Sequence, residues 1–148
     1  MTGGPTRAES VAAALAEIPE EALVVIVHDA ARPLVDEAVI ERLLGPLAEG
    51  YDGAVPVLPV ADTLKRVRDR AIVETVDRRE IAAAQTPQAF LAEPFRRAFG
   101  GDLEDATDCA SLVERAGGRV AVVDGDPRLL KITTPADLAA VESLLQAT

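Results

Sequence analysis

The chain has 148 residues, a formal net charge of −10 and 49% hydrophobic residues. This length and apolar content fit one domain with a real core rather than disorder, and the negative charge argues against a general binder of nucleic acid or of anionic membranes. No apolar stretch approaches the ~20 residues that a membrane span needs, and the single cysteine excludes an internal disulfide framework, so we expect a soluble, cytoplasmic protein.

The predicted elements alternate between helix and strand, which is typical of a three-layer α/β domain. Thr6 and Glu9 have the spacing of a capping box, so a helix is predicted over residues 6–18. The apolar run over residues 22–27 has no polar alternation. It predicts a strand buried on both faces, and hence a parallel sheet covered by helices.

A helix and a second strand are predicted next. The helix covers residues 37–48 and ends at Gly50, and its apolar face carries Val39, Ile40, Leu43 and Leu44. The strand covers residues 53–57 and contains Pro56, which cannot donate a ladder hydrogen bond. We therefore expect this strand to be irregular or to lie at an edge of the sheet.

The pattern changes in the arm, about residues 59–79. Two runs, Thr63–Val67 and Ile72–Val76, flank a charged turn at residues 68–70. This arrangement predicts a protruding β-hairpin with polar edges outside the core. Such an arm would bury its apolar residues only against a second copy of the chain.

The remaining elements again alternate and end with a helix. Two helices, two strands and the last helix are predicted over residues 93–99, 105–116, 120–123, 129–132 and from residue 135 onward. Thr134 is the expected N-cap of the last helix, and Pro135 takes its first position. The elements predict an α/β fold in a single domain over residues 1–148.

The segment that follows the first strand, residues 28–33, combines an acid, a base and two alanines. It lies at the carboxyl end of the strand, where open α/β sheets bind ligands. Asp29 can bind a divalent metal, and Arg32 can bind a phosphate with two parallel hydrogen bonds. The small Ala30 lets a base or sugar approach the backbone. A simple turn with one ion pair remains the alternative for this segment alone, and His28 is more often a packing residue than a catalyst.

Further motifs join this segment in a fixed order along the chain: Gly3-Gly4-x-x-Arg7-x-x-Ser10-Val11, His28-Asp29-Ala30-Ala31-Arg32-Pro33, Asp62-Thr63-Leu64-Lys65-Arg66, Thr75-Val76-Asp77-Arg78, Gln85-Thr86-Pro87-Gln88-Ala89-Phe90, Thr107-Asp108-x-Ala110-Ser111 and Lys131-Ile132-Thr133-Thr134-Pro135-x-Asp137-Leu138. Together they resemble the 2-C-methyl-D-erythritol 4-phosphate cytidylyltransferase family, over almost the whole chain. The resemblance implies a Rossmann-like nucleotidyltransferase sheet. It also implies an enzyme of non-mevalonate isoprenoid biosynthesis that joins CTP to a polyol phosphate and releases pyrophosphate.

The resemblance also implies where the nucleotide binds. Gly4, Ser10 and Ala30 would line the pocket for cytosine and ribose. Asp29 would bind Mg²⁺, or another divalent cation, that bridges the triphosphate. Because a phosphate oxygen is already an anionic nucleophile, the reaction needs charge neutralisation and alignment rather than a general base.

The methylerythritol phosphate would be surrounded by side chains that match the family: Arg32, Thr63, Arg78, Thr86, Thr107 and Lys131. Lys131 and Arg78 are the expected catalytic residues, and Lys131 would neutralise the pentavalent transition state. In the family the hairpin reaches across a homodimer, so Thr63 and Arg78 would complete the site of the partner subunit. For these two residues alone, a solvated position on an exposed hairpin is the simpler interpretation.

Family members begin with a strand and a glycine-rich loop that cradles the CTP phosphates, and no such loop occurs between Met1 and Thr148. We therefore expect the N-terminal part of the domain to be missing, through a misplaced start or as a fragment, and these residues to be inactive alone. Two alternatives stay open. One is a cytidylyltransferase for ribitol 5-phosphate, which shares the Asp-Ala-Ala-Arg-Pro and Lys-Ile-Thr signatures, and the other is a non-catalytic dimerisation remnant.

Overall fold

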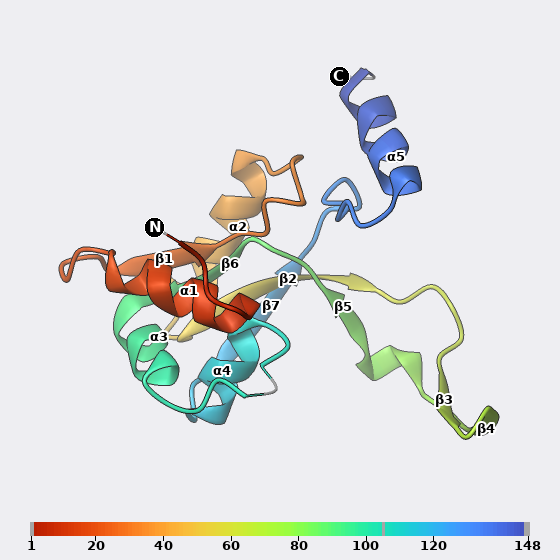
Figure 1. The fold of residues 1–148 in the computed structure, drawn as a ribbon, viewed down its shortest axis with the longest axis horizontal. Coiled ribbons are helices and arrows are strands. Elements are labelled where there is room, and N and C mark those ends of the chain that lie inside the picture. The colour runs from red at the N-terminus through yellow and green to blue at the C-terminus, as the bar shows by residue number, and fades with distance from the viewer. Residues whose placement is uncertain (1, 105, 147–148) are drawn as a thin grey trace.

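The computed structural model describes residues 2–104 and 106–146 (Figure 1). Helix and strand alternate, as the sequence predicts, up to residue 59 and again from residue 109, but strands follow one another over residues 53–91 and two helices come next. In chain order the elements are α1 (Arg7–Ala16), β1 (Val24–Val27), α2 (Glu37–Ala48), β2 (Gly53–Pro59), β3 (Lys65–Arg68), β4 (Ala71–Thr75), the 3₁₀ turn η1 (Arg78–Glu80), β5 (Ala82–Ala84), β6 (Gln88–Leu91), α3 (Ala92–Phe99), α4 (Cys109–Arg115), β7 (Val120–Asp124) and α5 (Pro135–Gln146).

The main sheet has five strands and is mixed rather than parallel. Its order is β1-β6-β2-β5, and β7 pairs in parallel with β2. Strand β6 runs antiparallel to both β1 and β2 and separates them. The α/β class is confirmed, but the expectation of a parallel sheet was wrong. Neither β5 nor β6 was predicted, because the segment from Ala82 to Leu91 is rich in alanine and interrupted by Pro87, and so lacks β-propensity.

Strand β2 is central, although its Pro56 suggested an irregular strand or an edge. Residues up to Ala54 pair with β6, and residues from Val57 onward pair with β5. The carbonyl of Pro56 accepts from the Gln85 N–H at 2.8 Å, on the side of the junction between these two partners. The N–H and C=O groups of one strand residue point to the same side. The N–H that Pro56 lacks would therefore point to the gap where β2 changes its partner from β6 to β5, so no ladder hydrogen bond is lost there.

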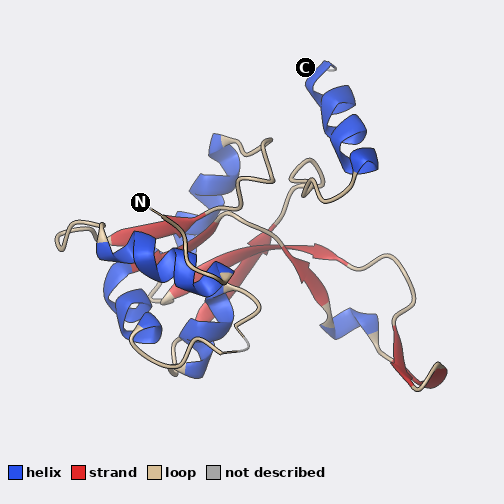
Figure 2. Cartoon of the chain, in the orientation of Figure 1, coloured by secondary structure: helices blue, strands red, loops and turns tan. Residues whose placement is uncertain are grey.

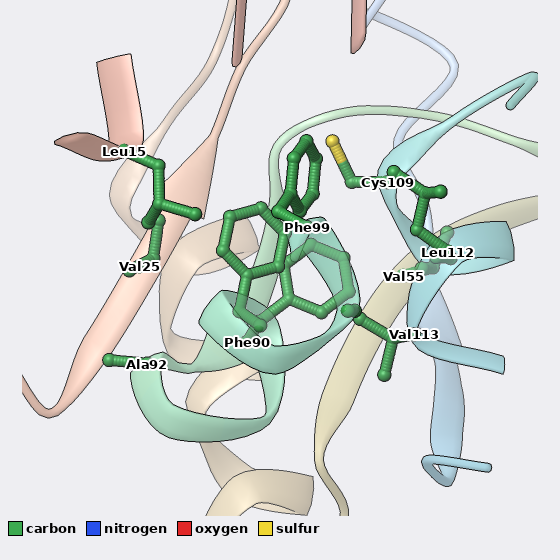
Figure 3. Packing of buried hydrophobic residues seen from close by; sticks show 12 residues of the cluster. Leu15, Val25, Val55, Phe90, Ala92, Phe99, Cys109, Leu112 and Val113 are labelled. Atoms are coloured by element: carbon green, nitrogen blue, oxygen red, sulfur yellow. The ribbon is translucent and has the colours of Figure 1, made fainter. Parts of the chain in front are cut away.

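Helices cover both faces of the sheet. On one face α1, α3 and α4 pack around Phe90, Phe95 and Phe99, whose neighbouring ring centroids lie 4.7 and 4.6 Å apart (Figure 3). On the other face α2 buries Val39, Leu43 and Leu47 against β2 and β6. The three layers therefore meet on strands whose successive side chains point to opposite faces.

Two expected exposures differ in the structure. Ile26 of β1 is 41% exposed, so the prediction of a strand buried on both faces was wrong. Val24 on the same face touches the α2 cluster, and Ile26 lies beyond it because α2 covers β2, β6 and β7. Leu44 of α2 is also 41% exposed, because the helix turns its 39-43-47 stripe toward the sheet.

The segment 129–132 forms no strand. Leu129 is fully buried in the α2 cluster, and its carbonyl accepts a hydrogen bond from the Arg32 side chain. The Ile132 N–H donates to the Ala31 carbonyl at 2.8 Å. The predicted strand was wrong because side-chain and loop groups, rather than a neighbouring strand, satisfy this backbone.

Helix α4 is shorter than the predicted span of 105–116. It begins at Cys109 because the Asp108 side chain accepts from the Ser111 N–H at 2.9 Å and caps it. Residue 105 lies outside the described residues. The first helix starts at the predicted capping box of Thr6 and Glu9.

The hairpin expected in the arm is present as β3 and β4, and it extends away from the sheet (Figure 2). Asp69 and Arg70 form its turn, both with positive φ, as a tight hairpin requires. Its strands are exposed throughout. In the described part of the chain, no helix is long and apolar enough to cross a membrane.

The packing of α2 makes a direct prediction. Leu43→Ala should lower the free energy of unfolding by about 2–5 kcal/mol, because it opens a cavity under a fully buried side chain. Leu44→Ala is the matched control, since it makes the same chemical change one residue further along the helix on an exposed side. Denaturant unfolding measures both, and equal losses would contradict the described orientation of α2.

Candidate functional site

Polar side chains from distant segments meet at one edge of the sheet. Strands β1, β2 and β7 end at this edge, and β6 begins there because it runs in the opposite direction. The side chains line a cavity of about 270 Å³ and come from Arg7, Asp29, Arg32, Gln85, Thr86, Gln88, Thr107, Asp108 and Lys131. The structure thus brings five of the expected site residues together: Asp29, Arg32, Thr86, Thr107 and Lys131.

Asp29 is held between two cations. Its Oδ1 accepts from Nε and Nη2 of Arg7 at 3.1 and 3.0 Å, and its Oδ2 accepts from Nζ of Lys131 at 3.0 Å. Burial by itself raises the pKa of Asp29, but the hydrogen bonds from Lys131 and Arg7 outweigh it and hold the pKa below its ordinary value. The site therefore has an ionised carboxylate whose side chain is only 15% exposed.

A second cavity of about 410 Å³ adjoins the first. Asp29 and Arg7 line both cavities. Ser10 and Ala30 line the larger cavity but not the smaller one. Its remaining walls are largely apolar and come from α1, β1 and Phe95. Of the expected residues, Ser10 and Ala30 thus line one cavity and Arg32, Thr86, Thr107 and Lys131 the other, and Asp29 lines both.

Gly4 contributes through its backbone. Its N–H donates to Ser10 Oγ at 3.0 Å, which fixes the loop before α1 against the helix. A Cβ on Gly4 would lie 2.4 Å from the Cβ of Glu9 and 2.9 Å from the Glu9 backbone carbon. Because backbone cannot yield cheaply, this close approach needs glycine.

Hydrogen bonds from two side chains anchor the loop that carries Lys131. The Gln85 side chain donates to the Asp126 carbonyl at 2.9 Å and accepts from the Asp126 N–H at 3.0 Å. Arg32 donates to the Leu129 carbonyl further along the same loop. These contacts hold the backbone that precedes Lys131, whose side chain reaches back to Asp29.

Thr63 and Arg78 do not join the cavities within one chain. Both lie in the arm, and the Arg78 guanidinium donates to the Ala61 carbonyl of the arm itself. Figure 1 shows the arm extending away from the edge where β1 and β7 end. These two residues stand apart from the other expected site residues in a single subunit.

Several polar residues at the site were not assigned a role from the sequence. Arg7 pairs with Asp29, Gln85 holds the Lys131 loop, and Gln88 donates to Asp108 Oδ2 at 2.9 Å while 1% exposed. For the two glutamines a signal was available in the sequence. They lie in a segment that ends in apolar residues, and buried amides need hydrogen-bond partners, so both could have been expected to bond neighbouring loops.

Comparisons with known proteins relate the chain to one family. The model of the family described as 2-C-methyl-D-erythritol 4-phosphate cytidylyltransferase matches residues 1–147. A protein of that name from Saccharopolyspora erythraea is 47% identical over 149 residues, which cover 98% of this chain and 66% of that protein. One from Nocardia farcinica is 48% identical over 146 residues, or 98% of this chain and 63% of that protein. The chain thus spans just under two thirds of these relatives.

A solved structure is similar throughout. The crystal structure of 2-C-methyl-D-erythritol 4-phosphate cytidylyltransferase from Thermus thermophilus superposes with a TM-score of 0.85 at 38% identity. The match covers 99% of this chain and 72% of that chain. At this identity and coverage the likeness extends to the arrangement of the whole described chain.

The ion pairs at Asp29 predict its titration. In an NMR titration the Asp29 carboxyl should have a pKa below the ordinary aspartate value, and Lys131→Met should raise it, because one hydrogen bond and one charge are lost. Arg97→Met, which removes an exposed cation on α3, is the control and should not move it.

The sign of the pH dependence follows from this shift. Because the pKa is lower in the folded state than in the unfolded state, the contribution of Asp29 to stability is complete above the unfolded pKa. It is lost as the pH falls through the lowered, folded pKa. An Asp29 pKa that stays the same in Lys131→Met would contradict the described pairing.

Proposed function

Because the chain belongs to the 2-C-methyl-D-erythritol 4-phosphate cytidylyltransferase family, we propose that the protein carrying it joins CTP to 2-C-methyl-D-erythritol 4-phosphate and releases pyrophosphate. The observation that supports this reaction most directly is the position of Asp29 and Lys131. Asp29 borders both cavities, and Lys131 lines the smaller one beside it. Two anionic reactants can therefore meet at a point where the chain supplies cations.

We assign the cytidine half of CTP to the larger cavity. Ala30 leaves room for a flat base or sugar, and Ser10, with its hydroxyl bonded to the Gly4 backbone, supplies polar contacts. The apolar wall suits a nucleobase face. The polyol phosphate then occupies the smaller cavity, where Arg32, Thr86, Thr107 and Lys131 converge.

The residues align the reactants and neutralise charge. An oxygen of the polyol phosphate attacks the α-phosphorus of CTP, the bond to the β-phosphate oxygen breaks, and pyrophosphate leaves. Lys131 can release Asp29 and donate to an oxygen on the developing pentavalent phosphorus, where an oriented charge stabilises the transition state most.

A divalent cation such as Mg²⁺ fits beside Asp29. The carboxylate is ionised, and hard oxygen is the ligand type that Mg²⁺ prefers. Asp29 Oδ2 becomes free when Lys131 turns to the phosphates. The cation would supply positive charge to the triphosphate, and Asp29 is the residue that would hold it.

We propose that the protein works as a homodimer in the cytoplasm. The arm has exposed apolar residues, Val67, Ile72 and Val73, and no core of its own. Contact with a second copy would cover them and could carry Thr63 and Arg78 to the site of the partner. The single buried cysteine is compatible with a reducing compartment.

The reaction is tested with the full-length gene product. Pyrophosphate release should require CTP, a divalent cation and 2-C-methyl-D-erythritol 4-phosphate together. Lys131→Ala should lower kcat by about 10²–10³-fold, since one preorganised donor to the transition state is removed. Arg97→Ala, on the exposed side of α3, is the control and should retain the rate.

The substrates separate the proposal from its alternatives. Ribitol 5-phosphate replaces the methylerythritol phosphate in a parallel assay. A higher kcat/KM with ribitol 5-phosphate would contradict the proposed substrate, and no turnover with either polyol phosphate would favour a non-catalytic dimerisation role.

The shared site is tested by mixing subunits. Arg78→Ala and Lys131→Ala protomers should each be weak alone. In a heterodimer one site carries both lesions and the other carries neither, so about half of the unsubstituted activity per heterodimer should return. If heterodimers form without recovery of activity, Arg78 does not act across the dimer.

A further inference from the structure

His28 lines the larger cavity, and both of its ring nitrogens contact residues that line the smaller one. Nε2 lies 2.8 Å from the Arg32 carbonyl oxygen, and Nδ1 lies 3.3 Å from Thr86 Oγ1. A carbonyl oxygen can only accept, so Nε2 must carry a hydrogen. In the neutral ring Nδ1 is then an acceptor, and the Thr86 hydroxyl donates to it.

The hydrogen bonds of Thr86 Oγ1 can be counted from this point. Its one hydrogen goes to His28 Nδ1, and it accepts from the Asp29 N–H at 3.0 Å. A hydroxyl oxygen has two lone pairs, so one acceptor position remains. Thr86 is 4% exposed and lines the smaller cavity, so the geometry leaves it an acceptor toward a ligand there.

We propose that His28 is a positioning residue that fixes the direction of the Thr86 hydroxyl. In the tautomer with hydrogen on Nε2, His28 holds the Thr86 proton away from the cavity, and Thr86 then selects a ligand group that donates. A polyol hydroxyl donates, whereas a phosphate dianion offers only acceptors. This inference rests on the proposed function and refines it: Thr86 recognises a hydroxyl of the polyol, and the phosphate lies against Lys131.

The His28 ring is also connected to Asp29 through a chain of hydrogen bonds. His28 Nε2–H holds the Arg32 carbonyl, and the Arg32 N–H donates to the Asp29 carbonyl at 2.9 Å. The Asp29 N–H in turn donates to Thr86. One imidazole therefore fixes both the backbone turn that presents the Asp29 carboxylate and the hydroxyl that faces the polyol cavity.

The tautomer can be measured without substrate. His28 is the only histidine of the chain, so its imidazole ¹⁵N resonances need no assignment between residues. We expect a protonated Nε2 and an unprotonated, hydrogen-bonded Nδ1. In Thr86→Val the Nδ1 resonance should shift toward that of a free acceptor nitrogen, whereas Thr133→Val, whose hydroxyl bonds Asp137, should not move it. Hydrogen on Nδ1 in place of Nε2 would overturn the inference.

Two substitutions separate the bonds of His28 in the full-length protein. His28→Asn keeps an acceptor close to the Nδ1 position, and His28→Gln keeps a donor close to the Nε2 position. The KM for 2-C-methyl-D-erythritol 4-phosphate should rise about three- to tenfold in His28→Gln, with recovery in His28→Asn. Because both substitutions alter the wall of the larger cavity in the same way, the KM for CTP should not differ between the two variants. Equal KM values for the polyol phosphate in the two variants, or a difference of the same size for CTP, would show a merely structural histidine. Because the NMR result needs no activity, it remains decisive if the protein proves not to be a transferase.

Discussion

The carboxylate of Asp29 is the contact on which the site depends. It joins Arg7 at the start of the described chain to Lys131 near its end, across 22 and 102 positions of sequence. Removing a carboxylate from water is costly, and two hydrogen-bonded cations offset the cost. Loss of either cation would leave a partly buried charge without full compensation, so the geometry of the three residues is mutually determined.

Strand β6 gives this contact its surroundings. It runs against its neighbours and therefore begins where β1 and β7 end. Gln88, its first residue, and Thr86, two residues before it, are buried. Thr86 bonds Asp29 and His28, and Gln88 bonds Asp108. A buried strand that starts with polar residues thus supports the site loops from beneath, while Phe90 at its other end anchors the core.

The core and the arm are stabilised in different ways. The three phenylalanines on one face and the α2 stripe on the other hold the sheet, and the site loops rest on it. The arm, in contrast, is exposed throughout both strands. A tight turn and a two-stranded ladder set the geometry of the arm. Because the arm has no buried core, its function depends on the surface that it contacts.

Local signals in the sequence determined much of this protein. Thr6 with Glu9, the apolar stripe before Gly50, and Thr134 with Pro135 located helices, because caps and periodicity act over a few residues. The order of the motifs predicted Asp29, Arg32 and Lys131 as site residues, and the structure places all three at one cavity.

Only the tertiary structure decided how these pieces meet. The antiparallel course of β6, the central position of Pro56 and the loop at 129–132 depend on partners far away in sequence, which local propensity cannot show. The partners of Arg7, Gln85 and His28 were hidden for the same reason. Burial leaves each polar group to find a hydrogen-bond partner, and only the folded arrangement of the strands determines which partner lies within reach.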